Sequence, residues 1–210
     1  MTFASVYEIL TPLTTVKKQW FVEWFDGDAL KSYWTTVDVL GSSTFAMDDT
    51  IDGGFTITTP ASGSNRARIG FNNIRHYSNT ASIIIAMFKS NTTANGQIAY
   101  VGLRNAIADN DTQQQVNANF DGNQTNIQFE SGDASTATQD DTGVARHTNF
   151  TTVKIEMLSA SAKLTLDGTV TNTKTTNLPT VRLQPQMESR IFSGTTATVG
   201  SLRYLEAFNT

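Results

Sequence analysis

Carboxylates are the residues of this chain that could do acid–base chemistry, and their spacing decides what they could do. Two carboxyl groups about 5 Å apart can serve as nucleophile and acid/base in one site. The segments 126–131, 153–158 and 186–191 read as strands with one carboxylate each, and the close aspartate pairs fall in turns. A pairing of Glu130 with Glu188 across strands is the remaining arrangement. We expect no catalytic residue and no enzymatic activity from it.

Other reactive groups are scarce. The chain has no cysteine and only two histidines, His76 and His147, which stand apart in the sequence and are expected in loops. Neither a nucleophile elbow nor a phosphate-binding glycine loop occurs. Acidic turns at Asp48, Asp49 and Asp52, and at 109–111, hold enough oxygen ligands for calcium but lack EF-hand spacing. We therefore expect no metal site and no cofactor, with calcium as the alternative.

Polar side chains alternate along three of the expected strands, so they should share one face of a sheet. The apolar partners Ala99, Val101, Leu103, Ile127 and Phe129 should then face the core. A solvated sheet face with ion pairs is the favoured interpretation, and a glycan or protein contact surface is the alternative. The candidate ligand-binding residues on this face are Tyr100, Arg104, Gln128, Glu130, Gln186, Glu188 and Arg190.

The strands that must position these residues are short, evenly spaced and separated by turns such as Asn95-Gly96 and Asp167-Gly168. About a dozen of them, with no helical period, predict an all-β, two-sheet antiparallel sandwich of jelly-roll type. Residues 1–19 read as an N-terminal arm and 20–210 as one sandwich domain. The polar, aperiodic segment 132–149 predicts a surface loop.

A cluster of aromatic residues near the start of the domain has two interpretations. Trp20 and Trp24 would lie with Val22 on one side of a strand, and Phe25, Tyr33 and Trp34 follow closely. Large aromatic side chains dominate protein cores, so core or edge packing is favoured. The alternative is that exposed rings offer stacking platforms for sugars.

Composition excludes several partners. The 210 residues carry a net charge of −4, whereas nucleic-acid binding needs a basic face. No segment is apolar enough for a membrane span, and the first residues do not form a signal peptide. We expect a protein made in a cytoplasm that binds neither nucleic acid nor membrane.

The order of several motifs resembles the concanavalin A-like lectin/glucanase superfamily, especially laminin-G-like and glycoside hydrolase family 16-like domains. The motifs are FDGDALKSYWTT, FTITTP, VKIEML with KLTLDGTV, QPQMESRI and SLRYLEAFN, over roughly residues 21–208. The resemblance implies two curved sheets whose concave face binds or cleaves glycans in relatives. It also implies a Glu-x-Asp-x-x-Glu strand in the enzymes, which this chain lacks.

These observations leave three function classes. We expect a non-enzymatic structural protein of a virus or phage particle, such as a capsid decoration, tail or fibre component, located in the virion. It would associate with copies of itself and with other virion proteins. The first alternative is a glycan-binding module, and the second is a glycoside hydrolase with non-standard carboxylates.

Overall fold

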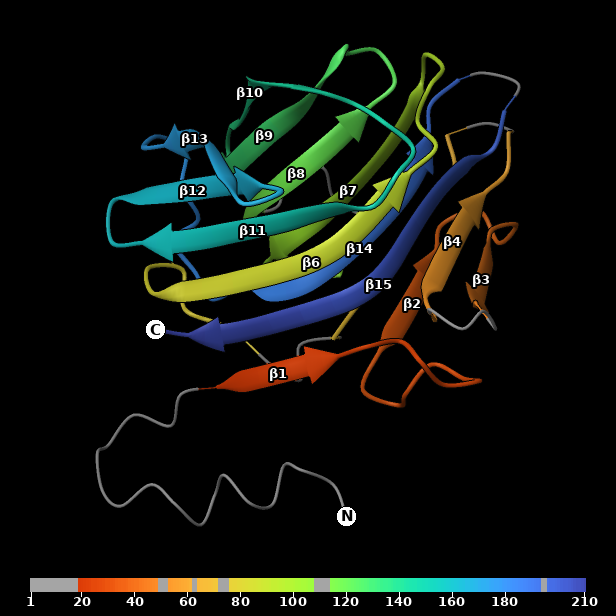
Figure 1. The fold of residues 1–210 in the computed structure, drawn as a ribbon, viewed down its shortest axis with the longest axis horizontal. Coiled ribbons are helices and arrows are strands. Elements are labelled where there is room, and N and C mark those ends of the chain that lie inside the picture. The colour runs from red at the N-terminus through yellow and green to blue at the C-terminus, as the bar shows by residue number, and fades with distance from the viewer. Residues whose placement is uncertain (1–18, 49–52, 62–63, 72–75, 108–113, 194–195) are drawn as a thin grey trace.

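The computed structural model describes residues 19–48, 53–61, 64–71, 76–107, 114–193 and 196–210. Within these ranges the chain forms fifteen strands and no helix, and all strand pairs are antiparallel. They build two sheets that pack face to face (Figure 1). The prediction of an all-β, two-sheet sandwich is confirmed.

One sheet has eight strands. Its order is β13 (Thr169–Lys174), β12 (Ser161–Leu166), β11 (Thr151–Leu158), β6 (Ser82–Ser90), β15 (Thr198–Asn209), β4 (Phe55–Thr59) and β3 (Thr44–Met47). β15 is long enough to serve two partners on the same side: its first half pairs with β4 and its last residues pair with β1 (Trp20–Glu23). This sheet faces the viewer in Figure 1.

The other sheet has seven strands. Its order is β10 (Ala137–Ala145), β9 (Asn126–Asp133), β8 (Gln114–Asp121), β7 (Gln97–Arg104), β14 (Gln184–Ile191), β5 (Arg66–Gly70) and β2 (Thr35–Asp38). Of the strands predicted to carry the polar residues, β7 and β14 lie at its centre and β9 lies next to the edge strand β10. β8 separates β7 from β9.

Alternation along the strands builds the core between the sheets. Ala99, Val101 and Leu103 of β7 are fully buried there, as are Ile127 and Phe129 of β9, which confirms their predicted direction. Phe88 of β6 meets Phe120 of β8 across the interface with ring centroids 5.1 Å apart. Because every second residue is committed to this interior, the intervening residues must form the two outer faces.

The predicted loop at 132–149 is wrong in its middle part. Residues 137–145 form β10, an edge strand paired with β9. The strand β13 of the other sheet also contacts β10. The Lys174 ammonium lies 2.9 Å from the Asp140 carboxylate, and the Asn172 side-chain amide donates to the Asp141 carbonyl at 3.1 Å. The segment shows no apolar alternation because most of β10 is exposed. The short strand β2 was also not expected.

The predicted packing is wrong for Trp20 and Trp24, which point outward at 55% and 61% exposure, whereas Phe21 between them points into the core at 6%. Phe25 is buried as predicted, at 2% exposure. Trp34 is buried and Tyr33 is half-buried, so those two rings do pack against the core.

Glu23 can face inward on this strand because several hydrogen-bond donors contact its carboxylate. Its carboxylate accepts from Lys31 Nζ at 2.8 Å and also from the Tyr33 hydroxyl. Burial alone would raise the pKa of Glu23, but these donors hold it below its ordinary value.

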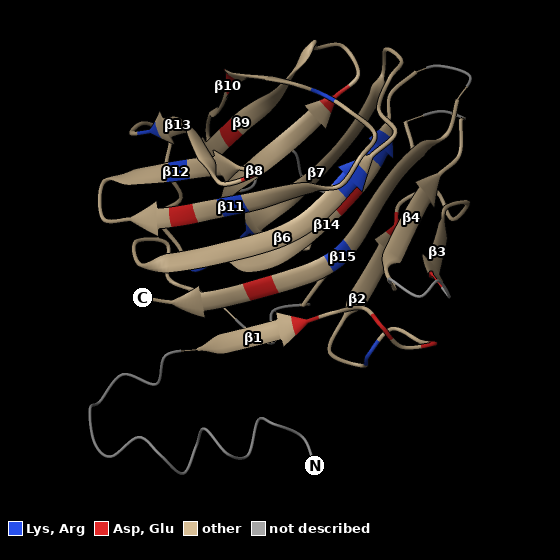
Figure 2. Ribbon diagram, in the orientation of Figure 1, with Lys and Arg blue, Asp and Glu red and all other residues tan. Residues whose placement is uncertain are grey.

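The predicted arm at 1–19 falls almost wholly outside the described residues. Gln19 is described, and its carbonyl accepts from the Asn209 amide at 3.0 Å, next to β1 and the end of β15. Charged residues are sparse on the strands of the eight-stranded sheet (Figure 2), in keeping with the low-charge surface.

Candidate functional site

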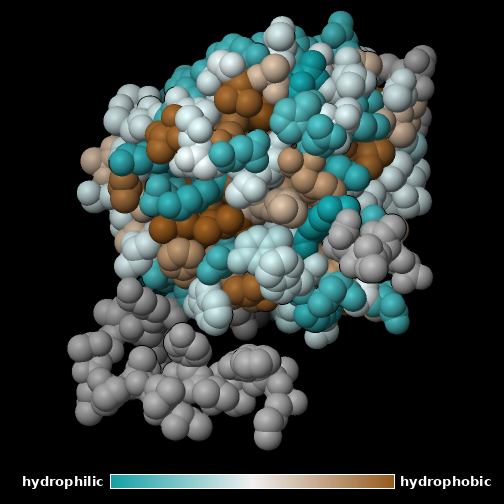
Figure 3. Space-filling model, viewed as in Figure 1, coloured by the Kyte–Doolittle hydropathy of each residue, from teal (hydrophilic) through white to brown (hydrophobic). Residues whose placement is uncertain are grey.

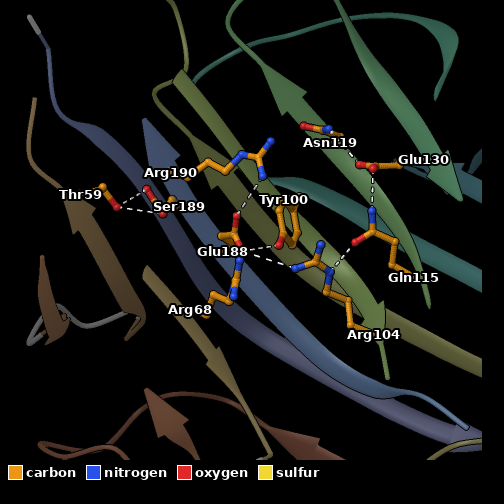
Figure 4. Close-up of polar contacts among 10 residues, drawn as sticks. All are labelled: Thr59, Arg68, Tyr100, Arg104, Gln115, Asn119, Glu130, Glu188, Ser189 and Arg190. Atoms are coloured by element: carbon orange, nitrogen blue, oxygen red, sulfur yellow. Dashed lines mark hydrogen bonds and ion pairs between the residues drawn. The ribbon is translucent and has the colours of Figure 1, made fainter. Parts of the chain in front are cut away.

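All seven predicted site residues lie on strands of the seven-stranded sheet, and all point to its outer face (Figure 4 shows five of them). Strand register brings them together. Glu188 of β14 lies opposite Tyr100 of β7 on one side and opposite Arg68 of β5 on the other. Gln186 and Arg190 flank Glu188 on its own strand. Arg104 of β7 lies two residues after Gly102, which is the residue opposite Gln186.

Glu188 is the centre of this face. Its carboxylate accepts hydrogen bonds from Arg68 Nε and the Tyr100 hydroxyl, and it meets Arg104 Nη1 at 3.5 Å and Arg190 Nη1 at 3.8 Å. The side chains of Glu188 and Arg68 are both fully buried. Burial would raise the pKa of Glu188, but the arginines, Arg68 first, outweigh it and hold the pKa below 4.5. Glu188 is therefore a carboxylate anion fixed by cations.

A second carboxyl group joins the network through a relay. Arg104 donates to the Gln115 side-chain oxygen, and Gln115 Nε2 donates to Glu130 at 2.6 Å. Asn119 Nδ2 donates to the other Glu130 oxygen at 3.2 Å. Burial raises the pKa of Glu130 above its ordinary value, although Arg104, Arg190 and the amide donors act to lower it. Burial likewise raises the pKa of Tyr100, which acts as a neutral donor.

The geometry does not bring Glu130 and Glu188 together as a catalytic pair. β14 and β9 are separated by β7 and β8, so three strand spacings place their backbones roughly 14 Å apart. Glycosidase carboxyls stand about 5 Å apart in retaining enzymes and up to about 9.5 Å apart in inverting ones. The side chains of Arg104 and Gln115 stand between the two carboxyl groups, so these groups do not face each other directly. The absence of enzymatic activity stays a prediction.

The interpretation of this face as solvated is wrong. Tyr100 and Arg104 are 3% and 2% exposed, and Gln186 and Glu188 are 0% exposed. The face is a packed polar layer. Contact of a ligand with Tyr100, Arg104, Gln128, Glu130, Gln186, Glu188 or Arg190 remains a prediction.

Sequence reasoning missed four members of this layer: Arg68, Gln115, Asn117 and Asn119. The last three alternate with Val116, Ala118 and Phe120 in β8, so the period of two already visible in the sequence could have placed them on the polar face. The side-chain amides of Asn117 and Gln186 have no hydrogen-bond partner among the described residues.

The outer face of the eight-stranded sheet carries an aromatic group that is open to solvent. Trp20 Nε1 donates to Glu206 at 2.8 Å, and the Tyr204 hydroxyl donates to the other Glu206 oxygen at 2.7 Å. The Trp24 ring packs on Tyr204 with centroids 4.5 Å apart. We call Trp20, Trp24, Tyr204 and Glu206 the aromatic platform.

The platform has a defined shape because β1 and β15 set it. Val22 lies opposite Glu206 and Trp20 opposite Phe208, so the two indoles stand on either side of the Glu206 carboxylate along the strand direction. Four residues of extended chain place their backbones roughly 13 Å apart. Burial and the hydrogen bond to Glu206 raise the pKa of Tyr204, which therefore stays a neutral donor.

Apolar surface continues from the platform. Met87 of β6, 37% exposed, lies opposite Tyr204, and Figure 3 shows a band of hydrophobic atoms over β6 on this face. The result is a surface of rings and aliphatic side chains beside the Glu206 carboxylate.

The calcium alternative rests mostly on residues that the structure does not describe. Of the acidic turns considered for it, Asp49, Asp52 and residues 109–111 lie outside the described residues. In the described ranges no group of three or more histidine or acidic side chains could hold a metal ion, and no helix there could cross a membrane.

No family model matches the chain, and no curated protein matches it in sequence. Solved structures do. A β-glucanase from Bacillus licheniformis matches with a TM-score of 0.67 and 14% identity, over 91% of this chain and 98% of that one. The Crh5 transglycosylase matches with a TM-score of 0.67 and 13% identity, over 91% and 84%. The carbohydrate recognition domain of Emp47p matches with a TM-score of 0.63 and 9% identity, over 90% and 94%.

The fold is a concanavalin A-like jelly roll. The resemblance to the lectin/glucanase superfamily is confirmed at the level of fold. The expectation of a virus or phage structural protein is wrong, because the similar structures include glucanases, a transglycosylase and a carbohydrate recognition domain.

Proposed function

We propose that the protein binds glycans and that the aromatic platform is its binding surface. The observation that carries this proposal is the outward direction of Trp20 and Trp24, which are 55% and 61% exposed beside the Glu206 carboxylate. Large aromatic side chains usually lie buried or contact a partner. Two exposed indoles beside a carboxylate that binds one of them therefore indicate a contact surface.

The chemistry of the platform suits a sugar chain. An indole face covers the C–H groups of a pyranose ring and removes them from water. Glu206, held by Trp20 and Tyr204, keeps acceptor capacity for sugar hydroxyls, because a carboxylate offers about four lone-pair sites. The low surface charge favours a neutral polysaccharide over an ionic partner. The similar structures, a β-glucanase and a carbohydrate recognition domain among them, agree with a glycan ligand.

Native gel electrophoresis through mixed-linkage β-glucan, laminarin or cellulose derivatives tests the proposal. We expect retardation of the protein by at least one of these polymers. Trp24→Ala should weaken the apparent affinity about tenfold, a loss of about 1.4 kcal/mol. Phe192→Ala is the matched control, since Phe192 is a 43% exposed ring that follows β14 of the other sheet.

The outcomes separate the alternatives. Retardation that survives both Trp20→Ala and Trp24→Ala would move the binding surface away from the platform. No retardation by any polymer of the panel would refute glycan binding there.

A further inference from the structure

A cavity of about 350 Å³ lies at one end of the sandwich, apart from the residues of the platform. Three segments line it: Ser90–Thr93 at the end of β6, the turn 122–125 between β8 and β9, and 146–148 between β10 and β11. They come from both sheets. The cavity is therefore a feature of the folded sandwich and not of one loop.

Arg146 fixes these segments relative to one another. Its guanidinium donates to the carbonyl oxygens of Thr92, Gly122 and Gln124, and its backbone amide donates to the Thr125 carbonyl at 3.1 Å. Because the planar guanidinium binds both of the other segments, it fixes the shape of the cavity before a ligand binds. Three of the five guanidinium N–H donors are used in this way, which leaves two.

The cavity wall offers hydrogen-bonding groups that the described protein does not use. The hydroxyls of Thr93, Thr125 and Thr148 and the Gln124 amide make no side-chain hydrogen bond within the described residues, and all four residues are exposed. His147 Nδ1 is buried without a partner there, while its Nε2 lies 3.3 Å from the Thr151 hydroxyl. Buried polar atoms normally have partners. A ligand rich in hydroxyl groups would supply them.

Among the described residues that line the cavity, Arg146 carries a positive charge and none is acidic. Asp121 is the acidic group that acts on Arg146, and its Oδ1 is bound by the backbone and side-chain nitrogens of Asn123. Lys89 and Arg203 both lie over the Phe150 ring, at 4.7 and 4.1 Å from its centroid. Lys89 and Phe150 are close in the sequence to the lining segments. In Figure 2 blue segments mark this end of β6 and the connection after β10.

We infer that this cavity binds a single uronic acid residue, as a free sugar acid or as the end of an acidic glycan. The carboxylate would take the two remaining Arg146 donors, and the ring hydroxyls would meet the threonine hydroxyls, the Gln124 amide and His147 Nδ1. The volume suits one or two pyranose rings but no extended chain. The inference is independent of the proposed function, because the platform and the cavity share no residue.

Calorimetric titration of the full chain with D-glucuronate tests the inference, with D-glucose as the neutral match. We expect glucuronate to bind at least about tenfold more tightly than glucose, as one charge-assisted contact of about 1.4 kcal/mol requires. The double variant Thr93→Val/Thr125→Val keeps side-chain shape and removes two hydroxyls. It should weaken glucuronate binding about fivefold or more.

Thr173→Val on β13 is the control for the hydroxyl loss, since Thr173 is exposed and far from the cavity in the sheet order. Equal affinity for glucose would overturn the acidic class of ligand. Unchanged binding in the double variant, or no binding by a folded protein, would overturn the site. Trp24→Ala should leave glucuronate binding intact, so failure here and failure of the platform are distinguishable.

Discussion

The outer faces of the two sheets place their polar and aromatic residues in opposite environments. On the seven-stranded sheet Glu188 and Arg104 are 0% and 2% exposed, whereas on the eight-stranded sheet Trp20 and Trp24 are 55% and 61% exposed. Ordinary expectation is the reverse, since charged side chains favour water and indoles favour the interior. A buried charge must be paired to persist, and an exposed ring gains by covering a partner. The first face is therefore a packed layer of paired charges, and the second leaves its rings accessible for the proposed binding.

The sharpest test of this contrast is Glu188→Gln. The change removes the carboxylate that faces Arg68, Arg104 and Arg190, and breaking a buried charge pair costs about 3–5 kcal/mol. We expect a loss of that size in the free energy of unfolding, measured in urea. Glu206→Gln, on the half-exposed carboxylate of the platform, is the control and should change stability far less. Similar losses in both variants would erase the difference between the faces.

A second test probes how tightly the polar layer packs. Gly102 lies between Gln186 and Asn117 in the strand register, and a Cβ there would overlap the carbonyl oxygen of Val116. Gly102→Ala should destabilise the protein by about 1–3 kcal/mol through overpacking. Gly27→Ala is the matched control, because the nearest atom to its Cβ would be the Ala29 oxygen at 3.8 Å. A tolerated Gly102→Ala would mean that the layer is loose enough to admit a ligand.

Sequence patterns predicted this fold well where one face of a strand is apolar. In β7 and β9 alternation identified both the core residues and the polar candidates, and the structure places them on the expected faces. Their burial could not be read from alternation, because a period of two says which face a residue occupies and nothing of what lies above that face. The same limit hid the relay through Gln115, whose role depends on the neighbouring strand.

The first strand shows where the pattern fails. In WFVEWF both faces carry bulky apolar residues, so the period gives no direction, and the inward Glu23 argues for the wrong one. Its partners Lys31 and Tyr33 come from the following loop, and only the folded chain brings them to the carboxylate. β10 fails differently. As an edge strand with mostly exposed residues it has no hydrophobic signal to detect.

The pH dependence of stability separates the two carboxyl groups of the polar layer. Burial raises the pKa of Glu130, so at pH values above 4.5 the native state holds more protons than the unfolded state. Its contribution to stability therefore falls as pH rises through that window. Glu130→Gln should remove this fall, so its stability relative to the wild type should improve as the pH rises above 4.5. Urea unfolding at a series of pH values measures it.

Glu188 has the opposite sign. The arginines lower its pKa, so its contribution is present above 4.5 and is lost as pH falls through the native value. Glu156→Gln, a partly exposed carboxylate of β11, serves as the control for both. A constant difference in stability between wild type and Glu130→Gln across the range would contradict the dominance of burial over the pKa of Glu130.

The smallest expected effect on stability completes the comparison. Trp24→Ala removes a ring that is 61% exposed, so its free energy of unfolding should stay within about 1 kcal/mol of the wild type. Phe21→Ala, on the opposite face of the same segment and 6% exposed, should lose about 3–5 kcal/mol. A ring that can be removed without loss of stability and with loss of β-glucan binding is present for contact. If Trp24→Ala instead unfolds the protein, the platform belongs to the core, and both outer faces stabilise the fold.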